Sequence, residues 1–203
     1  IDFAENKNIS IIHFSTDYVF DGQATEPYPE EALTNPIGIY GNSKLQGEVY
    51  LSKSSCKNVT IRTSWLFSPF GKNFVKTVAQ IAKGKSALKV VDDQWGRPTY
   101  GIDLARTVLK LISNDTMYTL PILHYANKGM CNWKEFAEAI INELEHKTTI
   151  QGIPTSAYPT LAKRPKYSIL DTGQIEKELQ IEIPTWQESL KKCIQILKSD
   201  GSL

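Results

Sequence analysis

Tyr40 and Lys44 are four residues apart in a segment that predicts the first turns of a helix. One helical turn takes 3.6 residues, so side chains at this spacing lie on the same face of the helix. A positive charge beside a phenol stabilises the phenolate, which makes the tyrosine a better proton donor. The same spacing is also typical of a half-buried tyrosine beside a lysine whose ammonium reaches water. The upstream residues are therefore needed to tell these readings apart.

Hydroxyl groups and a carboxylate follow a short apolar segment upstream. Residues 9–14 are apolar and β-branched, which is typical of a central strand in a parallel sheet covered on both faces. Ser15, Thr16 and Asp17 come directly after this segment. Ligands of open α/β sheets bind at the carboxyl ends of the strands, so these side chains are placed for chemistry. Turn formation and helix capping are the alternative roles of the same residue types.

The rest of the chain alternates strands and helices, which predicts an α/β protein with a smaller appended lobe. Residues 23–36 form a long loop with three prolines, and such a loop is usually functional or mobile. We expect strands over residues 59–67, 88–91, 122–126 and 149–153, and helices over residues 40–52, 73–83, 102–112, 133–145, 174–179 and 185–197.

The composition is that of an ordinary globular protein, with 41% hydrophobic and 22% charged residues. The net charge of +1 gives no indication of a nucleic-acid or membrane partner. Cys56, Cys131 and Cys193 are widely separated and form neither a metal-binding spacing nor a disulfide framework, which favours a reducing, cytoplasmic setting. No apolar run approaches the ~18 residues of a membrane span, and no signal peptide is recognised.

Four sequence strings carry a resemblance to a known family. They are Ser-Thr-Asp-Tyr-Val-Phe-Asp-Gly at 15–22, Tyr-Gly-Asn-Ser-Lys-Leu-Gln-Gly-Glu at 40–48, Arg-Thr-Ser-Trp at 62–65 and Val-Asp-Asp-Gln-Trp-Gly-Arg-Pro-Thr at 91–99. With these strings the chain resembles the extended short-chain dehydrogenase/reductases, and most closely the dTDP-4-dehydrorhamnose reductase family. The resemblance covers nearly the whole chain.

The resemblance implies the C-terminal part of a Rossmann-like, doubly wound parallel sheet with a smaller mixed α/β substrate lobe. Residues 1–88 would form the remainder of the Rossmann-like domain. Residues 89–203 would form mostly the substrate lobe, with about 101–126 returning to the main sheet. The family's Gly-rich turn, which holds the cofactor pyrophosphate, is absent from the sequence, and the chain opens on Ile1 without a helix start signal. We therefore expect that an N-terminal cofactor-binding segment is missing and that this chain alone is inactive.

The resemblance also implies the reaction, in which NADPH reduces the C4 keto group of dTDP-4-dehydro-L-rhamnose. Tyr40 would donate the proton, Lys44 would assist Tyr40 and bind the nicotinamide ribose, and Thr16 would donate a hydrogen bond to the developing oxyanion. Ser15 and Arg62 would lie near the cofactor, although Arg62 could instead brace its strand. NADH is the alternative cofactor, because the residues that would contact the 2′-phosphate of NADPH, and so distinguish it from NADH, would lie in the missing segment.

Further residues are expected to contact the substrate or to support its site. Asp17 and Tyr18 would meet sugar hydroxyls, and Trp65 would offer a flat apolar face, with a core position as its alternative. Arg97 and Arg164 would bind the pyrophosphate or lie on the surface as ordinary arginines. The complete set of expected substrate contacts is Asp17, Tyr18, Trp65, Asn73, Gln94, Arg97, Thr99 and Arg164, of which Asn73 could simply begin a helix.

The remaining predictions concern metal binding, oligomeric state and alternative functions. His13, His124 and His146 do not cluster, and we predict no metal, although some relatives bind Mg²⁺ at a subunit interface. A homodimer is common in the family. The alternatives are an epimerase or 4,6-dehydratase of the same superfamily, a non-catalytic regulatory subunit like that of methionine adenosyltransferase, and a simple binding module. A dehydratase commonly has Asp-Glu after its catalytic Thr, whereas Asp17-Tyr18 follows Thr16 here.

Overall fold

The computed structural model describes residues 1–114, 118, 120–158, 160 and 162–201. In chain order the elements are α1 (Asp2–Lys7), β1 (Ile11–Thr16), the 3₁₀ helix η1 (Asp17–Val19), α2 (Ile39–Ser52), β2 (Asn58–Thr63), β3 (Leu66–Phe67), α3 (Phe74–Ala82), β4 (Ala87–Val91), β5 (Trp95–Gly96), β6 (Thr99–Tyr100), α4 (Gly101–Ile112), β7 (Ile122–Tyr125), β8 (Cys131–Asn132), α5 (Trp133–Glu143), β9 (Thr149–Ile153), the 3₁₀ helix η3 (Thr155–Ala157), α6 (Gly173–Leu179) and α7 (Trp186–Ser199).

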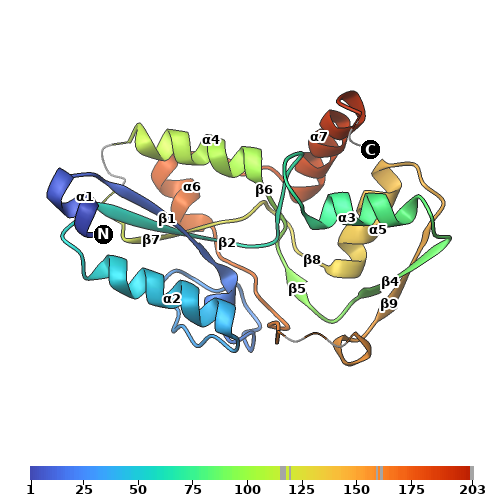
Figure 1. Cartoon of the computed structure of the whole chain (residues 1–203), viewed down its shortest axis with the longest axis horizontal. Helices are drawn as coiled ribbons and strands as arrows, with labels where there is room; N and C mark the ends of the chain where they lie inside the picture. Colours follow the sequence, from blue (N-terminus) through green and yellow to red (C-terminus); the bar gives the residue numbers. More distant parts are fainter. Residues whose placement is uncertain (115–117, 119, 159, 161, 202–203) are drawn as a thin grey trace.

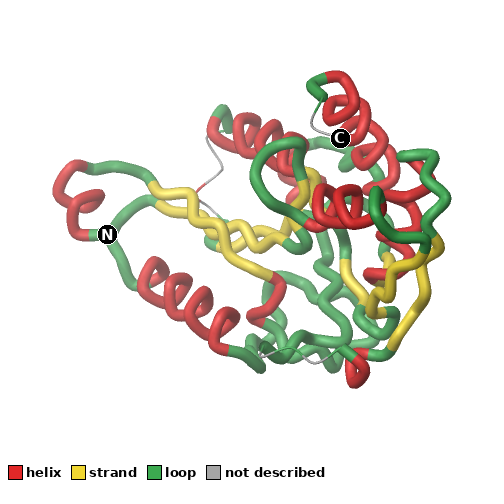
Figure 2. The backbone as a smooth tube through the Cα atoms, turned by 45° about the vertical axis from the view of Figure 1, so that its right-hand side comes forward, coloured by secondary structure: helices red, strands yellow, loops and turns green. Residues whose placement is uncertain are grey.

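A parallel sheet with the strand order β1-β2-β7 forms the centre of one half of the molecule. Helix α2 lies on one face of this sheet, and α4 and α6 lie on the other (Figures 1 and 2). In register, Thr16 at the end of β1 pairs with Thr63, and Thr63 pairs with Tyr125. The carboxyl ends of the strands therefore meet at one edge, as the predicted α/β fold requires.

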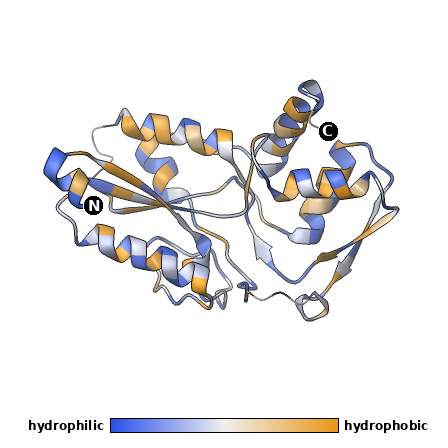
Figure 3. Cartoon of the chain, in the orientation of Figure 1, coloured by the Kyte–Doolittle hydropathy of each residue, from blue (hydrophilic) through white to orange (hydrophobic). Residues whose placement is uncertain are grey.

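Helices α2 and α4, which lie on this sheet, have the mixture of hydrophobic and hydrophilic residues expected of helices between a sheet and solvent. Both α2 and α4 carry hydrophobic and hydrophilic residues along their length (Figure 3). Leu104 and Leu111 of α4 pack with Val59, Ile61 and Leu123 of the strands. This cluster, which also includes Ile175 and Leu179 of α6, is the first core.

The strand predicted over residues 9–14 is present, shifted by two residues toward the C-terminus. The strand is β1, it runs from Ile11 to Thr16, and within the described residues it lies at the edge of the sheet. Phe14 is 44% exposed. The apolar, β-branched pattern indicates a strand, but it does not specify how many neighbours that strand has.

The single strand expected over residues 59–67 is two strands. Strand β2 ends at Thr63, and the backbone at Trp65 adopts a φ of 44°. This left-handed conformation is incompatible with a continuous strand, so the chain turns there. Strand β3 then leaves the sheet and pairs with β6.

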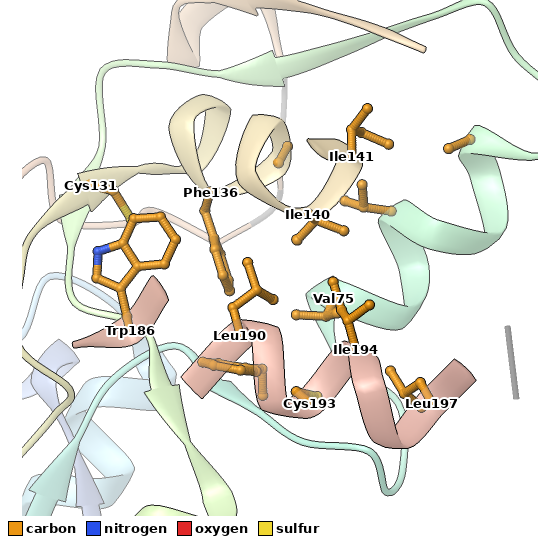
Figure 4. Packing of buried hydrophobic residues seen from close by; sticks show 14 of the residues in the cluster. Val75, Cys131, Phe136, Ile140, Ile141, Trp186, Leu190, Cys193, Ile194 and Leu197 are labelled. Atoms are coloured by element: carbon orange, nitrogen blue, oxygen red, sulfur yellow. The ribbon is translucent and has the colours of Figure 1, made fainter. Parts of the chain in front are cut away.

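A second core lies in the other half of the molecule, among α3, α5 and α7. Phe136, Ile140 and Ile141 of α5 face Val75 of α3 and the row of apolar residues on α7 (Figure 4). Strands β4 and β9 pair in parallel beside α5. The members of the second core are Phe67, Val75, Val78, Ala82, Tyr100, Cys131, Phe136, Ala137, Ile140, Ile141, Ile150, Trp186, Leu190, Cys193, Ile194 and Leu197.

The two cores do not follow the expected domain boundary at residue 88, because each contains residues from both sides of it. Helix α3 precedes that residue but packs on α5, whereas α6 follows it and packs on β7. Helix α4 and strand β7 belong to the first core, within the segment expected to return to the main sheet. Residues 115–117 and 119 of that segment lie outside the described residues.

Candidate active-site cleft

A cleft of about 990 Å³ opens at the carboxyl end of β1. It lies between the start of α2, the turn after β2, the start of α5 and residues 162–165. Its lining residues are Phe14, Ser15, Thr16, Asp17, Tyr18, Ile37, Gly38, Ile39, Tyr40, Gly41, Lys44, Thr63, Ser64, Trp65, Leu66, Trp133, Ala162, Lys163, Arg164 and Pro165.

Thr16, Tyr40 and Lys44 all line this cleft. Tyr40 is in the first turn of α2 and is 57% exposed, whereas Thr16, the last residue of β1, is buried. The ring of Tyr18 meets that of Tyr40 edge to face, with 6.1 Å between the centroids. The structure thus gathers in one cleft the three residues expected to donate the proton and to stabilise the developing oxyanion.

Gly41 brings the start of α2 against the end of β1. A Cβ at this position would collide with the carbonyl of Tyr18, so only glycine allows this approach. Helix α2 accordingly packs on η1, the segment that carries Asp17 and Tyr18. The position of Tyr40 relative to Thr16 therefore depends on the absence of a side chain at Gly41.

Asp17 is a buried carboxyl group at the bottom of the cleft. It is 2% exposed, and its Oδ1 accepts a hydrogen bond of 3.0 Å from Thr16 Oγ1. Burial raises the pKa of Asp17 to about 7, against the opposing effect of the Ser168 and Thr16 hydroxyls. Within the described part of the chain, neither Asp17 Oδ2 nor Ser15 Oγ has a hydrogen-bond partner. Two buried polar atoms of cleft-lining residues are thus left for a ligand to satisfy.

Arg62 is committed to partners inside the protein. Its Nη2 donates to Glu48 Oε2 at 2.7 Å, and its Nη1 donates to the carbonyl of Glu30 at 3.3 Å. The guanidinium also lies 5.2 Å from the centre of the Phe20 ring. Arg62 does not appear among the cleft-lining residues, so the structure accounts for it as a brace and offers no support for the expected cofactor contact.

His124 completes this brace as a neutral imidazole. Burial and then the charge of Arg62 lower its pKa to about 3. Nδ1 lies 3.1 Å from the carbonyl of Tyr28, and Nε2 lies 3.3 Å from Arg62 Nη1. Because a carbonyl only accepts and a guanidinium only donates, Nδ1 must carry the hydrogen. The brace therefore joins α2, β2, β7 and the loop over residues 23–36.

Two stacked tryptophans form a wall of the cleft. The rings of Trp65 and Trp133 lie 3.6 Å apart with an interplanar angle of 9°. Gly96 packs closely under the Trp65 ring, where a Cβ would collide with it. Trp133 was not among the predicted site residues. It follows the N-cap Asn132 and continues the apolar stripe of α5, three residues before Phe136, so no local signal separates it from a core residue.

Four of the expected substrate contacts do not line the cleft, and three of them, Asn73, Arg97 and Thr99, do not line the neighbouring pocket either. Asn73 caps α3 by accepting a hydrogen bond from Lys76 N at 3.2 Å, which matches its alternative role. Thr99 is fully buried and accepts from Thr63 Oγ1 at 3.1 Å. Arg97 is half-buried and donates to the carbonyl of Leu170 at 2.8 Å. Their polar groups hold the surrounding loops together.

Gln94 and Arg164 border a smaller neighbouring pocket of about 270 Å³. Gln94 is buried, and its Nε2 donates to Thr155 Oγ1 at 2.9 Å. Arg164 is exposed and, like Trp133, lines both this pocket and the main cleft. The two cavities therefore share a border at these two side chains.

The cleft residues fit part of a nicotinamide cofactor. The unpartnered Ser15 Oγ, the phenol of Tyr40 and the ammonium of Lys44 offer polar groups for sugar hydroxyls, and Phe14 and Leu66 offer apolar surface. No group of three or more His, Cys, Asp or Glu side chains suited to a metal occurs in the described ranges. None of the helices described combines the length and apolar character of a membrane span.

Comparison with known proteins identifies close relatives. The family described as the RmlD substrate binding domain matches residues 2–199. A dTDP-4-dehydrorhamnose reductase of Aggregatibacter actinomycetemcomitans is 41% identical over 194 residues, which cover 91% of this chain and 66% of the relative. The spore coat polysaccharide biosynthesis protein SpsK of Bacillus subtilis is 42% identical over 184 residues, covering 91% and 63%. The chain thus spans about two thirds of the length of these curated relatives.

Solved structures give the same result. The crystal structure of a dTDP-4-dehydrorhamnose reductase from Clostridium acetobutylicum superposes with a TM-score of 0.91 at 39% identity, covering 96% of this chain and 68% of the other. That of Bacillus anthracis, in complex with NADP, has a TM-score of 0.88 at 35% identity, covering 95% and 67%.

Proposed function

The chain belongs to the RmlD substrate-binding-domain family, and from this premise we propose that the full-length protein reduces the C4 keto group of dTDP-4-dehydro-L-rhamnose to give dTDP-L-rhamnose, with NADPH as the hydride donor. The observation that carries the proposal is the presence of Thr16, Tyr40 and Lys44 in one cleft. The product would serve rhamnose and surface polysaccharide biosynthesis, as the name of the SpsK relative supports.

NADPH, when bound, supplies the hydride that is added to the C4 carbon. The residues of this chain handle the charge that builds on the C4 oxygen. Tyr40, exposed in the cleft, donates a proton to that oxygen, and a positioned acid of this kind contributes about 10²–10⁴-fold in rate. Lys44, one turn further along α2, supplies positive charge beside the phenol and binds the nicotinamide ribose. Thr16 donates a hydrogen bond to the same oxygen.

Other cleft residues bind the remainder of the substrate. Asp17 Oδ2 and the phenol of Tyr18 meet sugar hydroxyls, and the Trp65–Trp133 stack offers a flat apolar face to a ring. Arg164, at the border of the two cavities, binds pyrophosphate oxygens. NADH stays open as the alternative cofactor. A homodimer stays a prediction, which the mass of the protein in solution tests.

The decisive experiment follows NADPH absorbance on addition of dTDP-4-dehydro-L-rhamnose to the full-length protein, including its expected N-terminal cofactor-binding segment. Tyr40→Phe should lower kcat about 10²–10⁴-fold. Tyr50→Phe is the matched control, because Tyr50 is exposed on the same helix but does not line the cleft. Unchanged turnover in Tyr40→Phe would contradict the proton-donor role. An inactive wild type would contradict the substrate, and copurification of a methionine adenosyltransferase would then support the regulatory alternative.

A further inference from the structure

The hydroxyl group of Thr16 is already engaged inside the protein. A threonine hydroxyl has one hydrogen to donate and two lone pairs that accept. Thr16 Oγ1 donates its hydrogen to Asp17 Oδ1 at 3.0 Å and accepts one from Tyr18 N at 3.2 Å. An ionised carboxylate can only accept, so while Asp17 is ionised the Thr16 hydrogen is not free for a substrate oxygen.

We propose that the protonation state of Asp17 determines whether Thr16 can donate to the substrate. One proton from solvent adds to the carboxylate, and the resulting O–H donates to Thr16 Oγ1. Thr16 keeps its bond from Tyr18 N and turns its own hydrogen toward the C4 oxygen. No other covalent bond changes. The inference rests on the proposed reductase function, and it makes Asp17 a positioning residue that acts through Thr16.

The surroundings of Asp17 allow both protonation states near neutral pH. The side chain is almost fully buried, and this burial raises its pKa to about 7. The groups that face it are the hydroxyls of Thr16 and Ser168 and the neighbouring phenol of Tyr18. The other titratable side chains of the cleft wall are Tyr40, Lys44, Lys163 and Arg164. Oδ2, without a partner among the described residues, keeps the capacity to bind a sugar hydroxyl when Oδ1 carries the proton.

The first test measures the link between the two residues without turnover. The carboxyl of Asp17 is titrated in the full-length protein by difference infrared spectroscopy against Asp17→Asn. Thr16→Val removes the donor that stabilises the carboxylate and should raise the titration midpoint by about 1 to 2 pH units. Thr16→Ser keeps the hydroxyl and should leave the midpoint near that of the wild type. An equal midpoint in Thr16→Val would overturn the inference.

The second test measures kcat against pH. Wild-type turnover should fall toward tenfold per pH unit above the Asp17 midpoint measured in the first test. Asp17→Asn cannot ionise, and its amide can donate to Thr16 as the protonated acid does, so this descending limb should vanish. An identical limb in Asp17→Asn would overturn the inference. If the wild type shows no turnover at any pH, the proposed reductase function fails, while the infrared titration still decides whether Thr16 and Asp17 are linked.

Discussion

Removal of one partner of the buried ion pair between Arg62 and Glu48 is predicted to lower the stability of the fold strongly. The side chains are 3% and 6% exposed, and their closest nitrogen and oxygen atoms lie 2.7 Å apart. Glu48→Gln keeps the size of the side chain but removes the negative charge that balances the guanidinium. Removal of one partner of a buried pair costs about 3–5 kcal/mol, because the other charge stays buried without compensation. This is a large fraction of the usual 5–15 kcal/mol that separates folded from unfolded protein.

The chain contains a matched control for this substitution. Lys134 and Glu138 have the same closest separation of 2.7 Å, but their side chains are 32% and 41% exposed. Glu138→Gln should therefore lower the free energy of unfolding far less than Glu48→Gln, because water screens an exposed pair. Urea denaturation followed by circular dichroism measures both losses. Equal losses in the two variants would refute the reasoning, since burial is what distinguishes the pairs.

A double variant separates the charge from the packing. In Glu48→Gln with Arg62→Met, the uncompensated cation is gone, so part of the lost stability should return. Glu48 lies four residues after Lys44, which itself follows Tyr40 by four, so the ion pair anchors the face of α2 that carries both residues. We expect Glu48→Gln to lower kcat as well, because the anchor sets the position of Tyr40.

Three further predictions concern pH and packing. Between pH 3.8 and about 7 the folded protein holds a proton on Asp17 that the unfolded chain has lost, so the contribution of Asp17 to stability falls as pH rises. The free energy of unfolding of Asp17→Asn, measured by urea titration, should therefore rise by about 4 kcal/mol relative to that of the wild type between pH 4 and 8. A difference between the two proteins that does not change with pH would contradict this prediction. The lowered pKa of His124 has the opposite effect: the contribution of His124 to stability is lost as pH falls from 6.5 toward 3. In His124→Gln the free energy of unfolding should therefore fall less steeply on acidification, by about 1.4 kcal/mol per pH unit. Gly41→Ala should cost about 1–3 kcal/mol, because its Cβ meets the Tyr18 carbonyl, while Gly84→Ala, with open space around it, should be neutral in the same thermal melts.

The sequence predicts the elements of this fold well because their signals are local. Apolar periodicity and caps such as Asn132 identify the helices within a few residues. Strand order and the split of residues 59–67 depend on pairing between distant segments and on the backbone of one residue, Trp65, and neither is visible in a local pattern.

The candidate site divides in the same way. Thr16 and Tyr40 follow from the ends of elements that any α/β sheet brings together, and the structure places both in one cleft. Arg97 and Thr99 belong to a string typical of the family, yet their side chains support loops, because a string in a sequence does not state which way a side chain points. Trp133 enters the cleft from an element far away in the chain, and only the tertiary structure brings it to Trp65.

The stacked tryptophans also give the protein an optical probe of its own. Trp65 follows β2 of the parallel sheet and Trp133 begins α5, and both rings pack against the second core while they line the cleft. Two indoles in face-to-face contact couple their electronic transitions and quench each other's emission. A ligand that enters the cleft and contacts the stack would change this coupling. Fluorescence and near-ultraviolet dichroism can therefore follow ligand binding in the cleft without any label.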